Sequence, residues 1–238
     1  MLVLSAPGGK MGGLGKLVLG GLVFAGLLFA MPLRADSLSE VLARMDRAAK
    51  DFMAITVDVK QTDYTAVLDE SKESSGTMAL RRTKNGNEMH VKFSEPDPYE
   101  WQLSGHTAKK YSPRANTVEI YDSNKLGTAE KMMLTGFGVS AADLKKDYDI
   151  KLVGSENIGS VPTTHIELTP KSADVRKYAA RVDLWIPDGQ ANPIREKFTE
   201  PSKDYLLCTY SNLKVNPSLP DSAFRLNLPQ GVKELHPQ

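Results

Sequence analysis

Histidine, cysteine and aspartate are among the residue types of this 238-residue chain that could perform nucleophilic, acid–base or metal chemistry. His90, His106, His165 and His236 show no HxxxH spacing, and no acidic or cysteine residue is arranged around them as a further metal ligand. Cys208 falls in an alternating stretch typical of a strand, where a half-buried structural thiol is the ordinary interpretation. We therefore predict no metal site and no catalytic residue.

Motifs for cofactor binding are equally weak. The segment Gly136-Phe137-Gly138-Val139-Ser140-Ala141 fits a loose dinucleotide pattern, but it lies between two predicted short helices instead of following a strand. Asp46, Asp51 and Asp58 are spread along solvated faces, and nothing pairs them for acid–base catalysis. The sequence contains neither a G-x-S-x-G elbow nor a Walker loop. We expect no cofactor, and an enzyme is the weaker class.

Residues 1–35 have the features of a secretory signal peptide. Lys10 and Lys16 precede an apolar, glycine-punctuated run at 17–29, and Pro32-Leu33-Arg34-Ala35 ends on a small residue. The apolar run of about 13 residues is shorter than the roughly 20 that span a bilayer, which favours cleavage over anchorage. We predict export, one domain at 36–238 and no stable membrane anchor, with Met1 or Met11 as the start.

Charge and cysteine content exclude further classes. After residue 35 the chain contains 27 basic and 29 acidic residues and no basic block, so we expect no nucleic-acid partner. Cys208 is the single cysteine, so an internal disulfide is impossible and the fold must depend on its core. It also lies far from the leader, which argues against a lipid anchor on the mature N-terminus.

One amphipathic helix and a series of strands are predicted to hold the remaining side chains in place. Ser37-x-x-Glu40 is a capping box, and the helix of about 15 residues that follows has apolar residues at helical spacing. From residue 55 the apolar period changes to two, and tight turns leave no room for crossover helices, so the sheet should be antiparallel. The predicted strands cover residues 55–62, 64–69, 76–82, 89–93, 99–103, 108–112, 117–122, 148–153, 163–168, 178–186, 194–199 and 205–213, and a weaker pattern suggests one more at 224–228. Short helices are predicted at 129–134 and 140–146.

These elements predict an α+β fold with a large curved antiparallel sheet. A twisted sheet of about eleven strands tends to curl toward a barrel, and about three helices are too few to cover it flat. We predict an unclosed β-barrel whose helical lid encloses a concave apolar space suited to a ligand.

The hairpin at residues 76–93 is the centre of this arrangement. Its two strands flank Asn85-Gly86, a strong turn signal, and share one broad apolar face with a guanidinium at its margin. A helix, another sheet or a ligand must cover such a face. The side chains expected on it are Met78, Leu80, Arg82, Met89, Val91 and Phe93.

The order of these elements resembles the periplasmic outer-membrane lipoprotein carrier (LolA) family over essentially the whole chain after the leader. The resemblance is carried by the leader and amphipathic helix followed by Val59-Lys60-Gln61-Thr62, Gly76-Thr77-Met78-Ala79-Leu80-Arg81-Arg82, Ser94-Glu95-Pro96, Leu134-Thr135-Gly136-Phe137-Gly138, Ile166-Glu167-Leu168-Thr169-Pro170-Lys171, Asp183-Leu184-Trp185-Ile186 and Leu228-Pro229-Gln230-Gly231-Val232. It implies an unclosed β-barrel that carries lipoprotein acyl chains from an inner-membrane exporter to an outer-membrane acceptor, without a cofactor.

The resemblance also implies that Arg82 helps to hold the lid, while the alternative is a strand-end arginine in solvent. The expected cavity and lid residues are Arg82, Met78, Leu80, Met89, Val91, Phe93, Trp101, Leu103, Leu42, Met45, Met132, Met133, Leu134 and Phe137. The methionines among them either line a cavity that opens and refills or simply pack between lid and sheet.

Three functions are consistent with this pocket. The first is a monomeric periplasmic carrier. The second is a sensor module that detects lipid in the same pocket and signals to a protein partner. The third is an enzyme acting on a lipid, which would need a polar cluster inside the cavity that the sequence does not assemble.

Overall fold

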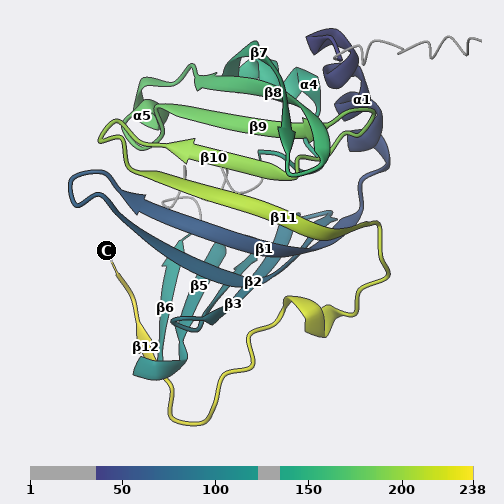
Figure 1. Ribbon diagram of the computed structural model, residues 1–238. Coiled ribbons are helices and arrows are strands. Elements are labelled where there is room, and N and C mark those ends of the chain that lie inside the picture. Colours follow the sequence, from purple (N-terminus) through teal and green to yellow (C-terminus); the bar gives the residue numbers. More distant parts are fainter. Residues whose placement is uncertain (1–35, 123–134, 238) are drawn as a thin grey trace, which may run out of the picture. The chain divides into compact units, whose positions relative to one another are not determined.

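A computed structural model describes residues 36–122 and 135–237 of the chain (Figure 1). Within these residues the chain forms α-helices, two 3-10 turns and one large sheet. The helices are α1 (Leu38–Asp51), α4 (Ala141–Asp147) and α5 (Ala173–Arg176), and the 3-10 turns are η1 (Pro113–Ala115) and η2 (Asp221–Phe224). The predicted helix after the capping box at Ser37 and the one at 140–146 are confirmed, whereas the one at 129–134 lies outside the described residues.

Twelve strands form a single sheet in the order β12-β6-β5-β4-β3-β2-β1-β11-β10-β9-β8-β7. All neighbouring pairs are antiparallel except β12 and β6, which run parallel. Because β12 and β7 are the two edges, the sheet is unclosed, as predicted. The strands are β1 (Ala54–Thr65), β2 (Glu70–Thr83), β3 (Gly86–Glu95), β4 (Tyr99–Ser104), β5 (Thr107–Ser112), β6 (Thr117–Asp122), β7 (Tyr148–Ile158), β8 (Val161–Pro170), β9 (Arg181–Pro187), β10 (Arg195–Thr199), β11 (Tyr205–Val215) and β12 (Lys233–Leu235).

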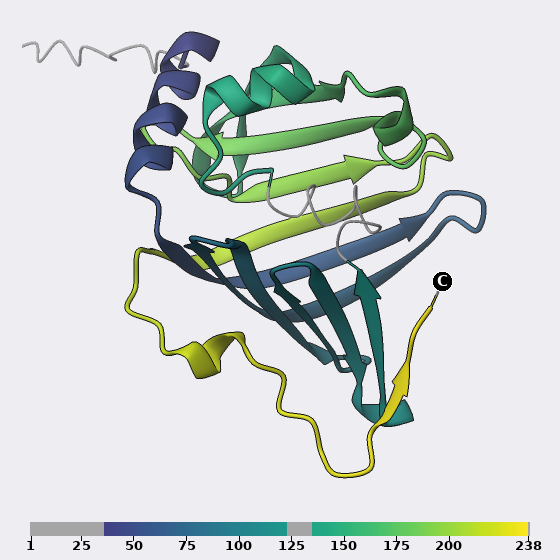
Figure 2. The ribbon, with the colours of Figure 1, turned by 180° about the vertical axis from the view of Figure 1, so that it is seen from behind.

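Helix α1 begins at the predicted capping box. The Ser37 hydroxyl accepts a hydrogen bond from the Glu40 amide at 3.3 Å, and the Glu40 carboxylate accepts one from the Ser37 amide at 2.7 Å. One face of the helix then buries Val41, Leu42 and Met45. These residues pack with α4 and with strands β8–β10, so the helices cover that part of the sheet (Figures 1 and 2).

A second apolar cluster lies on strands β1–β4 and β11. Its members alternate along each strand with polar residues of the opposite face, which is the period-two pattern of a half-buried sheet. The buried members include Ile55, Val57, Val59, Met78, Leu80, Met89, Val91, Phe93, Leu103, Cys208 and Tyr210, with Phe52 and Phe137 packed over them. Cys208 is thus buried rather than half-buried, because its strand faces this cluster.

Two predicted strands are wrong. No separate strand occupies 64–69, because β1 continues to Thr65 and a turn follows it. The polar run at 70–75, predicted as a turn, belongs to β2 and pairs with β1 from Thr65↔Glu70 onward. Residues 224–228 form no strand either, because Phe224 ends the 3-10 turn η2.

The C-terminal segment, residues 216–235, crosses the sheet on the face opposite to the apolar cluster (Figures 1 and 2). The backbone carbonyl of Ala223 lies 3.0 Å from Nδ1 of His90, and Gln102 donates from Nε2 to the Phe224 carbonyl at 2.6 Å. The segment then ends in β12, a strand that periodicity did not predict.

Candidate functional site

Arg82 lies near the end of β2, where the apolar face of the sheet meets the helices. Its guanidinium donates one hydrogen bond from Nη1 to the Ala49 carbonyl at 2.9 Å and another from Nη2 to the Gly138 carbonyl at 2.5 Å. The Cζ atom also lies 5.3 Å from the centre of the Phe52 ring. The arginine therefore connects the sheet to α1 and to the segment that precedes α4.

The carbonyl of Ala49 belongs to the last turn of α1, where carbonyls lack partners within the helix and the helix dipole is negative. Asn216 satisfies the neighbouring groups. Its Oδ1 accepts hydrogen bonds from the amides of Met53 at 2.8 Å and Ala54 at 3.2 Å, and its Nδ2 donates to the Asp51 carbonyl at 2.8 Å. A guanidinium and a side-chain amide, both from outside the helix, thus complete its C-terminus.

Position 138 can hold only glycine, because its backbone conformation and its neighbours leave no room for a side chain. Its φ is +68°, and a Cβ placed on it would lie 2.4 Å from the Phe52 ring. This close approach brings its carbonyl within reach of Arg82 and puts the preceding Phe137 over the sheet. Phe137 is 3% exposed and meets the Tyr210 ring edge-on, with 5.0 Å between the ring centres.

The structure brings most of the predicted cavity residues together. Phe137 shares one buried cluster with the side chains from β2, β3 and β4, and Trp101 packs against that cluster while partly exposed. The members of this group are Met78, Leu80, Met89, Val91, Phe93, Leu103, Trp101 and Phe137. Leu42 and Met45 belong instead to the neighbouring cluster between α1 and strands β8–β10. Met132, Met133 and Leu134 lie outside the described residues.

Sequence reasoning missed a buried polar group beside this cluster. Glu196 on β10 is fully buried, and its Oε2 accepts a hydrogen bond from the Tyr210 hydroxyl at 2.9 Å. Burial raises the pKa of Glu196 to about 8 and that of neighbouring Cys208 to about 12. A usable signal existed, because Glu196 alternates in step with Phe198 and so had to share the inner face of the strand.

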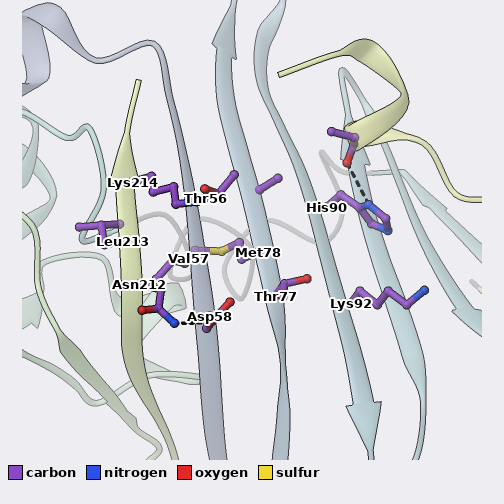
Figure 3. Close-up of a pocket in the computed structure, with 12 residues that line it drawn as sticks. Thr56, Val57, Asp58, Thr77, Met78, His90, Lys92, Asn212, Leu213 and Lys214 are labelled. Atoms are coloured by element: carbon purple, nitrogen blue, oxygen red, sulfur yellow. Dashed lines mark hydrogen bonds between the residues drawn. The ribbon is translucent and has the colours of Figure 1, made fainter. Parts of the chain in front are cut away.

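Two hollows of the described structure bear on the choice of a binding surface. One is a groove of about 580 Å³ on the opposite, outward face of the sheet, bordered by Ala223 of the C-terminal segment (Figure 3). It is lined by Thr56, Val57, Asp58, Thr77, Met78, Ala79, His90, Lys92, Asn212, Leu213, Lys214 and Ala223. Its lining combines apolar side chains with the charged side chains of Asp58, Lys92 and Lys214.

The other hollow, of about 420 Å³, lies at the Arg82 contacts themselves. It is lined by Asp46, Ala49, Lys50, Arg82, Gly138, Ser140 and Asp143. Asp46 also accepts a hydrogen bond from the Ala141 amide at 2.7 Å, so α1 and the start of α4 are joined across it. This hollow marks the seam along which α1 and residues 135–140 meet.

Residues 36–122 and 135–237 contain neither a cluster of metal ligands nor a membrane-spanning helix. No group of three or more His, Cys, Asp or Glu side chains in that part of the chain is placed to hold a metal ion. No helix there combines the length and the apolar character needed to span a membrane.

Comparison with known proteins agrees with this arrangement. Residues 129–236 match the model of a family described as a predicted periplasmic protein, DUF2092. An outer-membrane lipoprotein carrier protein of Cupriavidus pinatubonensis is 27% identical over 198 residues, which cover 76% of this chain and 87% of the relative. A protein of the same name from Ralstonia nicotianae is 26% identical over 147 residues, covering 59% of this chain and 65% of the relative.

Among solved structures, an uncharacterized conserved protein from Thermus thermophilus shares the fold. Its TM-score is 0.54 at 12% sequence identity, and the match covers 85% of this chain and 100% of that one. The chain is thus similar to a predicted periplasmic family over residues 129–236 and, at 26–27% identity, to proteins named outer-membrane lipoprotein carrier protein.

Proposed function

We propose that this protein binds the acyl chains of lipoproteins on the apolar face of its sheet and carries them through the periplasm. It would receive cargo from an exporter in the inner membrane and deliver it, as a monomer, to an acceptor in the outer membrane. The observation that carries the proposal is the buried face of β1–β4 and β11, covered by Phe52 and Phe137 under a segment held by Arg82.

A carrier is needed because acyl chains are costly to expose to water. A chain of about 15 methylenes costs roughly 12 kcal/mol at about 0.8 kcal/mol for each methylene. The face formed by β2 and β3 offers matching apolar surface, and two of its buried side chains, Met78 and Met89, are unbranched and adapt easily to a changing partner.

Loading requires that the present cover be displaced. Phe137 occupies the apolar face and is followed by Gly138, whose carbonyl is held by Arg82. Entry of an acyl chain would lift residues 135–138, exchange the Phe137 contacts for cargo contacts and break the bond from Arg82. The preference of the empty protein for the closed arrangement would then favour release of the cargo.

The first test is to identify what co-purifies with the protein. The full-length chain, expressed in a host with a functional envelope, should carry acylated species that native mass spectrometry detects. Purified protein should bind a fluorescent triacylated lipopeptide but not the same peptide after deacylation.

Matched phenylalanine variants locate the binding surface. Phe137→Ala removes the cover of the apolar face, whereas Phe224→Ala removes a ring that lies against Arg81 on the opposite face, 4.3 Å from its Cζ. Only Phe137→Ala should change lipopeptide affinity. The proposal is wrong if no acylated species co-purifies and the lipopeptide binds no better than its deacylated form. It is also wrong if the two variants change the affinity for the lipopeptide equally.

A further inference from the structure

Glu196 is a buried acid with one unused oxygen. Its side chain has no exposed surface, and Oε2 accepts the hydrogen bond from Tyr210. Within the described residues Oε1 has no hydrogen-bond partner. A buried polar atom without a partner costs free energy, so the presence of Oε1 at a buried position of β10 calls for an explanation.

The groups around Glu196 come from β11, from Tyr148 at the start of β7 and from the segment before α4. Cys208 lies opposite it in the pairing of β10 with β11, and Tyr210 and Tyr148 are the other titratable groups that face it. No ion pair to its carboxyl group is found among the described residues. The backbone of Gly136 lies against Oε1, because a Cβ added there would be 1.7 Å from Oε1 and 2.5 Å from Cγ of Pro193.

Gly136 therefore covers Oε1 of Glu196 with its backbone alone. It belongs to the segment that Arg82 holds. Two residues further on, Gly138 accepts the hydrogen bond from Arg82, and Phe137 between them packs on Tyr210. Any movement that frees the apolar face by lifting residues 135–138 also uncovers Oε1 of Glu196.

The protonation state of Glu196 decides what it can bind. Burial raises its pKa to about 8, so the side chain is a neutral carboxylic acid at pH 7. Because the Tyr210 hydroxyl donates to Oε2, the acid proton is available on Oε1. The uncovered group is thus a hydrogen-bond donor at the margin of an apolar surface. It suits a ligand oxygen that accepts a hydrogen bond and carries no proton of its own.

We propose that Glu196 recognises the ester or amide carbonyl through which a bound acyl chain is attached to its carrier molecule. This inference rests on the proposed function. The carbonyl is the polar atom that directly follows the methylene chain, so a chain laid on β2, β3 and β11 brings an acceptor to the edge of the apolar region. Lipidated proteins and membrane phospholipids share this chemistry.

The test compares two lipids that differ at one position. Palmitoyl lysophosphatidylcholine contains the ester carbonyl, and hexadecyl lysophosphatidylcholine has an ether in its place. Displacement of a fluorescent acyl probe should show that the wild-type protein prefers the ester by about three- to tenfold, the net effect of one hydrogen bond. Glu196→Leu should lose this preference and keep its affinity for the ether, whereas Glu196→Gln, which retains an N–H donor, should keep the preference.

A pH series makes the test independent of the leucine variant. The ester preference of the wild-type protein should disappear as pH rises through about 8, because a carboxylate cannot donate, while that of Glu196→Gln should stay constant. The inference is wrong if the wild-type protein shows no ester preference, or if that preference depends on neither Glu196 nor pH. It is also wrong if Glu196→Leu loses affinity for the ester and the ether equally. Failure of the wild-type protein to bind either lipid would instead overturn the proposed function.

A competition experiment distinguishes the two sources of the carbonyl. A triacylated lipopeptide and a diacyl phosphatidylethanolamine would each be used to displace the ether lipid from wild-type protein and from Glu196→Leu. The ligand whose competition is weakened by the leucine variant is the one that presents its carbonyl to Glu196. If neither is weakened, the inference is wrong.

Discussion

Arg82→Leu is the substitution that tests the closing mechanism most directly. The guanidinium joins β2 to α1 and to residues 135–138 through bonds of 2.9 and 2.5 Å to two backbone carbonyls. Leucine fills a similar volume beside Phe52 but cannot donate. The change therefore removes the polar connection while leaving the apolar contacts of the segment largely in place.

The magnitude follows from the two hydrogen bonds. Each charge-assisted bond contributes about 1.5–3 kcal/mol when shielded, but Arg82 is an exposed residue, so a total of about 2–3 kcal/mol is the more realistic value. At 1.4 kcal/mol for each factor of ten, this corresponds to a change of about 30- to 150-fold in the balance between open and closed forms. Since only the open form binds cargo in the proposed mechanism, apparent affinity should rise by up to that factor.

The assay is the partition of a fluorescent triacylated lipopeptide between the protein and phospholipid vesicles. Arg82→Leu should load readily and shift the partition toward the protein, whereas Arg82→Lys, which can reach only one carbonyl at a time, should give a smaller shift. Arg81→Leu is the matched control, because Arg81 points to the opposite face and pairs there with Glu88 and Asp221. If Arg82→Leu releases cargo to vesicles as the wild type and Arg81→Leu do, the closing mechanism is wrong.

Three further predictions concern stability. Gly138→Ala places a Cβ 2.4 Å from the Phe52 ring at φ +68° and should lower the free energy of unfolding by about 1–3 kcal/mol in urea titrations. Gly189→Ala is the control and should cost less, because φ is +77° there but no atom lies within 4 Å of the added Cβ. Asn216→Ala removes three hydrogen bonds at the end of α1 and should cost about 1–3 kcal/mol in the same measurement; an unchanged unfolding midpoint would contradict its capping role. Folding raises the pKa of Glu196 from 4.5 to about 8, so the folded state keeps a proton that the unfolded state loses in this pH range. The wild-type protein should therefore lose stability relative to Glu196→Gln as pH rises from about 4.5 to about 8. Parallel pH profiles would show that Glu196 is not protonated in the folded state.

Much of the sheet was predictable because its strands bury one face. The β2–β3 hairpin was located from the alternation of Met78, Leu80, Met89 and Val91 around Asn85-Gly86, and all four apolar side chains are at most 4% exposed. The tip of the β1–β2 hairpin was misread for the opposite reason. There residues 70–73 are exposed on both faces, so the polar run at 70–75 shows no apolar alternation although it is paired, while the apolar Val67 and Leu68 lie exposed in the turn.

The site was less predictable than the sheet, because its contacts join distant parts of the chain. Asn216 completes α1 across a separation of 165 residues, and no local pattern marks an asparagine as a cap for a remote helix. Arg82 was identified through family resemblance, since its spacing shows only that it shares a face with Leu80. Phe224 was predicted to begin a strand, yet it is buried because the C-terminal segment places its ring against Arg81.

Residues 135–138 link the closing contacts to the chemistry of the cargo. Gly138 accepts the hydrogen bond from Arg82, Phe137 covers the apolar face, and Gly136 covers the acid of Glu196. These three contacts lie within a span too short to bend independently, so breaking one of them weakens the others. An acyl chain that displaces Phe137 therefore also exposes the donor suited to its carbonyl, which makes recognition of the polar end conditional on burial of the apolar one. Free polar compounds cannot reach Glu196 without first displacing an aromatic ring from an apolar surface, and this order of events favours acylated cargo over water-soluble carbonyl compounds.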